Sequence, residues 1–141
     1  MREFYELAAQ FLNMRRSLPY VKFDRKISKK KKNEICILNY LEMHNGEAHP
    51  KDLSNEFIIS TPRMAVLLKQ LEEKGYIARI ADNNDSRQTI VKLQPKGDMF
   101  FENENLETIN FLSKFFKRLG TDDAREFVRL YLKLMNFVAE N

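Results

Sequence analysis

The stretch 60–93 constrains the fold of this chain most, because the spacing of its apolar residues changes within it. The first half places Met64, Leu67, Leu68 and Leu71 at the spacing of one buried helical face. An amphipathic helix is therefore predicted here. The side chains left to point outward are polar or basic: Thr61, Arg63, Lys69 and Gln70.

After this helix the sequence predicts a two-stranded hairpin. Gly75 suits a left-handed helix end, and from Tyr76 the period falls from 3.6 to 2. Apolar residues recur in the runs 76–80 and 89–93, and eight polar or small residues, 81–88, separate these runs. The arrangement is that of a helix followed by a two-stranded wing.

A second, shorter helix is predicted before the first one. Pro50 suits the first turn of a helix over 50–56, from which Leu53 and Phe57 pack inward and Lys51 points outward. Residues 57–59 form a tight turn. Ser60 or Thr61 then caps the next helix, with Pro62 in its first turn. Two helices joined by so short a turn form a helix-turn-helix unit.

The run 50–97 holds a set of characteristically spaced residues: Leu53, Ile59-Ser60, Leu67, Leu71, Glu73-Lys74-Gly75, Asp85-Ser86-Arg87, Leu93 and Lys96-Gly97. By these residues the run resembles the winged helix-turn-helix of the MarR (multiple antibiotic resistance regulator) family. The resemblance covers about a third of the chain closely. It implies a mainly α fold with a small β-wing, a winged helix-turn-helix flanked by dimerisation helices. One departure is that Gln94-Pro95 stand where the family usually has a threonine, which affects the capping of the next helix.

Long helices are predicted on both sides of the winged unit, and they carry apolar stripes that the winged unit is too small to cover. We divide the chain into an N-terminal dimerisation helix with a basic linker, the winged unit, and C-terminal dimerisation helices. Burial of the stripes against a second copy predicts an obligate homodimer. The alternative is an intrachain bundle that leaves a monomer. The three segments are 1–28, 29–94 and 95–141. Helices are expected over 3–18, 31–44 and 95–119, and from 121, where Thr121 is the expected cap.

Positive charge is concentrated in one segment. The formal net charge is +4, yet 22–32 alone holds seven basic residues and one acid, Asp24, which leaves 17 basic and 19 acidic residues elsewhere. Such a local field is typical of nucleic-acid binding. Lys29, Lys30, Lys31 and Lys32 stand at a predicted helix N-terminus, where their charge opposes the helix dipole, so an anion such as phosphate is the expected partner. A solvated lysine run is the alternative.

The resemblance assigns DNA contacts to the wing and to the helix that begins near Thr61, which would be the recognition helix. It implies that Thr61, Pro62, Arg63 and Val66 face base edges in the major groove. For Arg63 a guanine and a phosphate are comparably good partners. Lys69 and Gln70 are expected to touch the DNA backbone, and Arg87 the minor groove.

Other contacts are expected around these. The resemblance implies that Asp85 braces Arg87 or a recognition-helix base through an ion pair, although an isolated Asp-x-Arg is usually just a turn. With roughly eight phosphate contacts per dimer, the log–log salt slope would be about −7. Twofold symmetry predicts pseudo-palindromic half-sites about 10 bp apart. The wing-tip contacts are Asp85, Ser86 and Arg87, and the phosphate contacts are Lys29, Lys30, Lys31, Lys32, Lys51, Ser60 and Lys92.

The sequence offers little for catalysis or metal binding. His44 and His49 flank a turn, and no catalytic set is recognisable around them. With Glu42 they do not complete a tetrahedral metal site. We therefore expect neither an enzyme nor a cofactor. Cys36 lies in an apolar run, which favours a packed side chain over an exposed, redox-sensing thiolate.

A single cysteine, no membrane-length apolar run and no signal-peptide pattern predict a cytoplasmic protein.

The resemblance also implies a crevice for a small aromatic or phenolic anion between the dimerisation helices and the winged unit. An arginine would face the anion. The alternative is that the Met and aromatic residues are ordinary core and the arginines ordinary surface. The candidates are Met14, Arg15 or Arg16, Tyr40, His44 and Phe100.

Together these features predict a dimeric, sequence-specific transcription regulator, a ligand-responsive repressor on a pseudo-palindromic operator of double-stranded DNA. A winged-helix module that binds another protein is the alternative. Such modules often lose the basic recognition face, and Arg63, Lys69 and Arg87 argue against that loss here.

Overall fold

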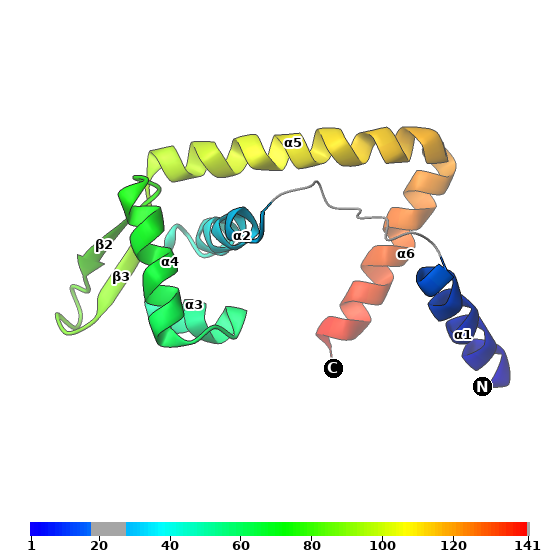
Figure 1. Ribbon diagram of the computed structural model, residues 1–141, viewed down its shortest axis with the longest axis horizontal. Coiled ribbons are helices and arrows are strands. Elements are labelled where there is room, and N and C mark those ends of the chain that lie inside the picture. The colour runs from blue at the N-terminus through cyan, green and yellow to red at the C-terminus, as the bar shows by residue number, and fades with distance from the viewer. Residues whose placement is uncertain (18–27, 141) are drawn as a thin grey trace.

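The computed structural model describes residues 1–17 and 28–140, with the side chains of 1–14 and 28–140. None of the helices within these ranges is both long and apolar enough to cross a membrane. Figure 1 shows the winged unit at one end of a long helix and two further helices at its other end. In chain order the elements are α1(Arg2–Ser17), α2(Lys29–Met43), β1(Glu47–Ala48), α3(Pro50–Phe57), α4(Thr61–Glu73), β2(Ile77–Ala81), β3(Thr89–Leu93), α5(Pro95–Leu119) and α6(Thr121–Ala139).

The hydrophobic core lies where α2, α3, α4 and the start of α5 meet the sheet. The stripe predicted for α4 is confirmed: Met64, Leu67, Leu68 and Leu71 are all buried. Each fully buried aliphatic side chain contributes about 1.5–3 kcal/mol to folding. This core fixes the outward face of α4. The other buried hydrophobic side chains are Ile37, Leu38, Leu41, Leu53, Ile77, Val91 and Phe101.

The sheet has three antiparallel strands in the order β1-β3-β2. The hairpin of β2 and β3 was predicted, and its register pairs Ile77 with Leu93 and Ala81 with Thr89. The two-residue strand β1, which pairs Glu47 with Lys92, was not predicted. So short a strand has no readable period, and it exists only because β3 offers it a partner.

Two helix starts differ from the prediction. Helix α2 begins at Lys29, two residues earlier than expected, because the Ser28 side chain accepts a hydrogen bond from the backbone N–H of Lys31. Thr121 was expected to cap α6. It lies instead inside the helix, after Gly120 at φ 89°, and no side chain caps this end. The change at Gln94-Pro95 also has the expected effect, since Gln94 precedes α5 without a capping side-chain hydrogen bond.

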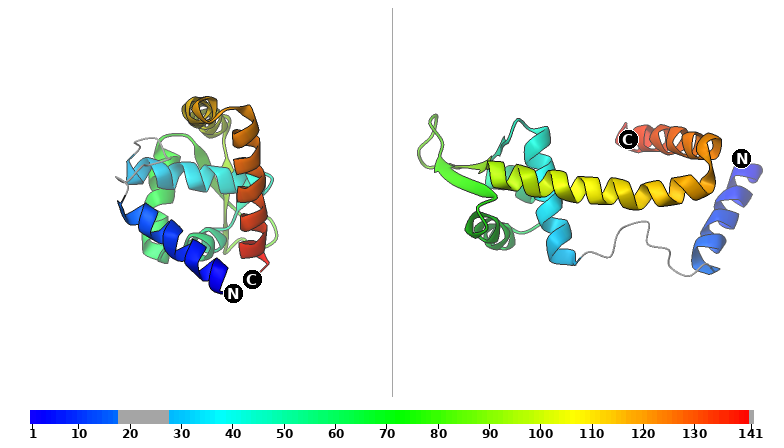
Figure 2. Two further views of the ribbon diagram at one scale, coloured as in Figure 1. Left: turned by 90° about the vertical axis from the view of Figure 1, so that its right-hand side faces the viewer. Right: turned by 90° about the horizontal axis from the view of Figure 1, so that it is seen from above.

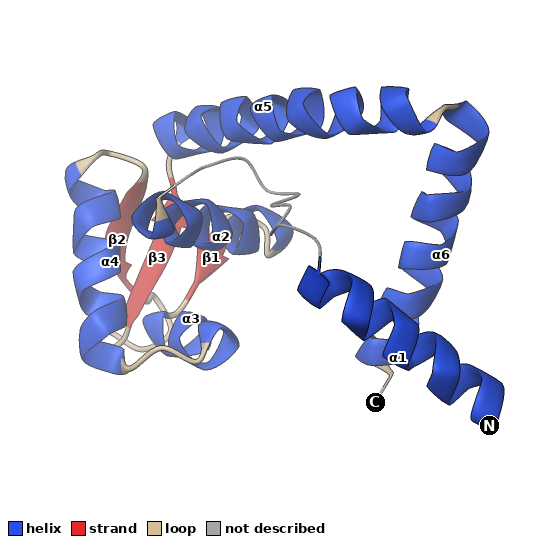
Figure 3. Cartoon of the chain, turned by 45° about the vertical axis from the view of Figure 1, so that its right-hand side comes forward, coloured by secondary structure: helices blue, strands red, loops and turns tan. Residues whose placement is uncertain are grey.

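The helices α1, α5 and α6 form an arm away from the winged unit. Helix α5 carries α6 to the far end, where α1 also lies (Figure 2). Figure 3 shows both helices apart from the sheet and its covering helices. Many large apolar side chains on these three helices are exposed to solvent. They include Phe4, Leu7 and Phe11 in α1, Leu106 and Ile109 in α5, and Phe127, Leu130, Leu134 and Phe137 in α6.

Candidate nucleic-acid interface

The first turn of α4 is exposed and carries a basic side chain. Ser60 caps the helix by accepting a hydrogen bond from the backbone N–H of Arg63, at 3.4 Å. Because the opposite face of α4 is buried, Thr61, Pro62 and Arg63 face solvent. Val66 is also exposed, at 55%. This turn combines a guanidinium with small apolar surface, which suits contact with a DNA groove.

The hairpin tip is organised by two aspartates. The Asp82 Oδ1 accepts a hydrogen bond from the backbone N–H of Asn84 at 2.9 Å, and the Asp85 Oδ1 accepts from that of Arg87 at 3.1 Å. Asp85 thus braces the backbone of Arg87. The ion pair that the resemblance implies for Asp85, with Arg87 or at a recognition-helix base, stays a prediction. Ser86 and Arg87 are exposed. The bracing leaves the guanidinium free to reach outward.

Helix α4 and the hairpin stand at the same end of the molecule. The views of Figures 1 and 2 agree that α4, β2 and β3 lie opposite α1 and α6. Glu72 near the end of α4 pairs with Arg79 in β2, with 2.9 Å between Oε1 and Nη2. Hydrogen bonding to Arg79 lowers the pKa of Glu72, and the same contact raises the pKa of Arg79. The pair ties the helix to the wing.

A second tie between the helix-turn-helix and the wing was not predicted. His49 precedes α3, and its Nε2 lies 2.9 Å from the Oδ2 of Asp82, the first residue of the hairpin tip after β2. The hydrogen bond with Asp82 raises the pKa of His49, and the same hydrogen bond lowers the pKa of Asp82. The two residues are 33 positions apart, so no sequence spacing reveals the contact.

The predicted phosphate-binding lysines do not gather at one place. Lys31 forms an ion pair with Glu104 of α5, 2.7 Å between Nζ and Oε1, beside the arm. Lys92 pairs with Glu47 across β3 and β1, and Lys51 and Lys69 are exposed on α3 and α4. Lys29 and Lys30 are exposed at the start of α2. Lys22, Arg25 and Lys26 lie outside the described residues. The phosphate contacts remain predictions.

The predicted crevice residues fall into separate groups within this protomer. Tyr40 stacks on His44, with ring centroids 3.8 Å apart, and packs edge-on against Phe57. Phe100 stacks instead on Tyr76. Met14 is exposed on α1, and the side chains of Arg15 and Arg16 are not among those described. A pocket of about 210 Å³ beside Phe100 is lined by Ser28, Lys30, Lys31, Glu34 and Lys74.

A partly buried ion pair in the wall of that pocket was not predicted. Glu34 is 3% exposed, and its Oε1 lies 2.5 Å from the Lys74 Nζ at the end of α4. A buried carboxylate needs such a partner, because desolvation without one costs several kcal/mol. Helices α2 and α4 are joined there.

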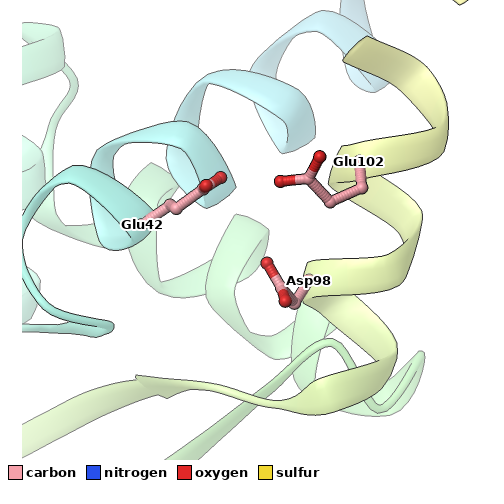
Figure 4. Close-up of side chains that lie close together, drawn as sticks. All are labelled: Glu42, Asp98 and Glu102. Carbon is pink, nitrogen blue, oxygen red and sulfur yellow. The ribbon is translucent and has the colours of Figure 1, made fainter. Parts of the chain in front are cut away.

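Three carboxylates come together between α2 and α5. Those of Glu42, Asp98 and Glu102 lie within 4.8 Å of one another (Figure 4). Desolvation, followed by repulsion from Glu102 and Asp98, raises the pKa of Glu42. All three residues are exposed, and oxygen ligands of this kind suit hard cations such as Ca²⁺ or Mg²⁺.

Cys36 lies on the outer side of α2 and is exposed. The apolar run around it had favoured a packed side chain. Its neighbour Ile37 takes the buried position instead.

Known proteins match both the sequence and the fold. Residues 31–88 match the family model described as MarR family. The HTH-type transcriptional regulator YdgJ of Bacillus subtilis (strain 168) is 26% identical over 103 residues, 73% of this chain. The matched region spans only 61% of that relative's length.

Solved structures share the architecture over nearly the whole chain. A putative transcriptional regulator of Pseudomonas aeruginosa superposes with a TM-score of 0.75 at 18% identity, covering 100% of this chain and 98% of the other. FabT of Streptococcus pneumoniae, solved in complex with DNA, gives a TM-score of 0.62 at 19% identity, covering 99% and 96%. At these identities the likeness concerns the fold.

Proposed function

We propose that this chain is a MarR-family protein, and that it is a dimeric, sequence-specific DNA-binding transcription regulator. The match of residues 31–88 to the MarR family model supports this assignment. The observation that carries the proposal is the exposed first turn of α4, with Arg63 on it, at the same end of the molecule as the wing. FabT, which shares the fold, has been solved with DNA bound.

The division of labour between helix and wing follows from side-chain chemistry. Arg63 presents a planar, two-pronged donor, which matches the O6 and N7 acceptors of guanine. Thr61 and Val66 add methyl groups that suit thymine. Arg87, on a narrow hairpin, suits the negative potential of an A·T-rich minor groove.

The helices of the arm form the dimer interface, so the dimer carries two copies of the DNA-facing surface. Side chains of α1, α5 and α6 leave large apolar areas in contact with water, and Leu130 and Leu134 are each at least half exposed. Burial of such surface against a second copy stabilises a dimer by about 25 cal/mol per Å². A twofold axis then presents two recognition helices to half-sites about one helical turn apart.

The regulatory step is a change in the spacing of the two recognition helices. Helix α5 of the arm is separated from the end of β3 by a single residue, so a small molecule bound between the arm and the winged unit would move one relative to the other. We assign the protein the role of a repressor that a small aromatic or phenolic effector releases from its operator.

DNA selection tests the proposal. Random-sequence duplexes are enriched on the full-length protein, and the enriched duplex is titrated by fluorescence anisotropy. Arg63→Ala and Arg87→Ala should each weaken binding by about 1–3 kcal/mol. Arg125→Ala, on exposed α6, is the matched control and should bind like wild type. No enrichment, or equal affinity in all four proteins, contradicts the proposal. A protein partner captured at equal stoichiometry would then favour the interaction module.

A further inference from the structure

We propose that His49 is a positioning residue for the wing, which holds the hairpin against the helix-turn-helix and makes DNA affinity depend on pH. The inference rests on the proposed function, and it assigns a regulatory role to a contact that lies outside the DNA-facing side chains.

Asp82 lies between the hairpin tip and the helix-turn-helix. This carboxylate follows β2 and uses its two oxygens differently. Its Oδ1 accepts a hydrogen bond from the Asn84 backbone N–H inside the hairpin tip, and its Oδ2 contacts the His49 Nε2 outside the hairpin. Asp82 therefore joins the tip to the helix-turn-helix.

Hydrogen bonds within the hairpin tip connect Asp82 to Arg87. The Asp82 backbone N–H donates to the Gln88 carbonyl oxygen at 2.9 Å, which closes the hairpin next to Arg87. The Gln88 backbone N–H donates in turn to the carbonyl oxygen of Asp85, whose side chain accepts from the Arg87 N–H. Movement of Asp82 is thus passed to Arg87 through hydrogen bonds over a few residues.

The charge state of His49 decides how many hydrogen bonds its ring can donate. Its Nε2 faces Asp82, and its Nδ1 lies 3.6 Å from the Asp52 Oδ2 of α3. A neutral imidazole carries one N–H, whereas the imidazolium carries two, so only the charged ring donates toward both carboxylates. Both contacts raise the pKa of His49 above its ordinary value of 6.5.

The other charged side chains near His49 and Asp82 form ion pairs with each other, accept a backbone hydrogen bond or are exposed to solvent. Strands β1 and β3 contribute Glu47 and Lys92, which pair with each other at 3.1 Å. Helix α3 also carries Lys51, which is exposed next to Asp52. Asp85 supports the hairpin by accepting from a backbone N–H. The two carboxylates facing His49 therefore dominate its ionisation.

The sign of the pH effect follows. Because the pKa of His49 is raised in the folded protein, the stabilising contact is complete below pH 6.5 and is lost as the pH rises through the folded pKa. The wing is then held less firmly, and Arg87 loses its fixed position relative to α4. DNA affinity should fall as the pH rises, by about fivefold or more once the ring is neutral.

The test uses the full-length protein and the duplex enriched on it, titrated at pH 6, 7 and 8 at constant ionic strength. Wild type should lose affinity as the pH rises. His49→Gln keeps a neutral donor and should flatten the profile, and Asp82→Asn should do the same. Glu56→Gln is the matched control, because Glu56 is an exposed carboxylate on the adjacent helix α3 and no contact with His49 or Asp82 is described for it. Its profile should follow wild type.

A double substitution separates positioning from general folding. If His49 acts through the wing, His49→Ala should cost little further affinity in an Arg87→Ala background. Additive losses, or an unchanged profile in His49→Gln while wild type binds DNA, would overturn the inference alone. Wild type that binds no duplex at any pH would overturn the proposed function as well.

A readout without DNA checks the contact itself. The ring protons of His49, followed by NMR, should titrate above pH 6.5 in wild type and shift downward in Asp82→Asn. Amide exchange at Arg87 and Gln88 should become faster in that variant. An unshifted titration with unchanged exchange would contradict the positioning role.

Discussion

Glu72 and Arg79 hold the end of α4, the proposed recognition helix, against β2, the first strand of the wing. The Glu72 Oε2 accepts from both the backbone N–H and the Nε of Arg79, each at 3.2 Å, and the Oε1 accepts from Nη2. Three hydrogen bonds from one carboxylate fix the angle at which β2 leaves α4. This angle determines where the wing lies relative to the recognition helix.

Glu72→Gln should therefore lower the free energy of unfolding by about 0.5–1 kcal/mol, a modest value because both side chains are a third or more exposed. The pKa of Glu72 is lowered, so the stabilisation is present above pH 4.5 and is lost as the pH falls through the folded pKa. Urea unfolding at pH 7 and at pH 3 measures this, with Glu73→Gln as the exposed control. An equal difference between wild type and Glu72→Gln at both pH values would contradict the role of the ionised carboxylate.

Gly97 is required where α5 crosses the start of the wing. A Cβ added at this position would lie 2.2 Å from the Tyr76 carbonyl oxygen. Gly97→Ala should destabilise the protein by about 1–3 kcal/mol, although alanine is the better helix former. Thermal unfolding measures the loss. Asn103→Ala, at an exposed position of the same helix, should be neutral or stabilising. A neutral Gly97→Ala would show that α5 does not approach β2 this closely.

Ile58 stores strain in the turn of the helix-turn-helix. It adopts φ 51° and ψ 47°, the left-handed region, and is 93% exposed. A β-branched residue in this conformation costs roughly 1–2 kcal/mol, and no packing offsets it. Ile58→Gly should therefore raise the free energy of unfolding by about 1 kcal/mol in urea melts. Ile59→Gly, at a half-buried position against the core, should lower it instead. Loss of stability in both variants would argue that Ile58 is needed as a contact.

The exposed stripe of α6 provides the test of dimerisation. Leu130→Glu combined with Leu134→Glu should convert the dimer into a monomer, because charges replace the apolar contact surface. Sedimentation velocity measures the mass. Arg125→Glu changes the charge on the side of the same helix opposite Leu130 and Leu134, and it should leave the dimer intact. A wild-type chain that sediments as a monomer would contradict the dimer directly.

Local sequence patterns predicted the structural features that depend on residues close together in the sequence. The buried face of α4, the cap at Ser60 and the extent of α5 from Pro95 to Leu119 follow from residues a few positions apart, and all are confirmed. Three features could not be read this way: strand β1, the Glu34–Lys74 pair and the His49–Asp82 contact. Each joins residues that only the folded chain brings together, at separations of 33 to 45 positions.

The same distinction holds for the residues of the candidate site: their exposure could be predicted from the sequence, but their contacts with distant helices could not. Exposure of Thr61, Arg63 and Arg87 followed from the helical period and the hairpin loop, and the structure agrees. The lysines of α2 could not be placed from sequence, because the partner of Lys31, Glu104, comes from α5. The grouping of Tyr40 with His44, apart from Phe100, likewise depends on how the helices cross.

Hydroxyl-radical footprinting of the full-length protein on its enriched duplex tests the central claim most directly, since it maps the helix and the wing on one DNA. The account predicts two equivalent protected segments about 10 bp apart, each flanked by minor-groove protection that disappears in Arg87→Ala while the inner segments remain. A single unpaired footprint, or flanking protection unchanged by Arg87→Ala, would contradict a twofold clamp built from α4 and the wing.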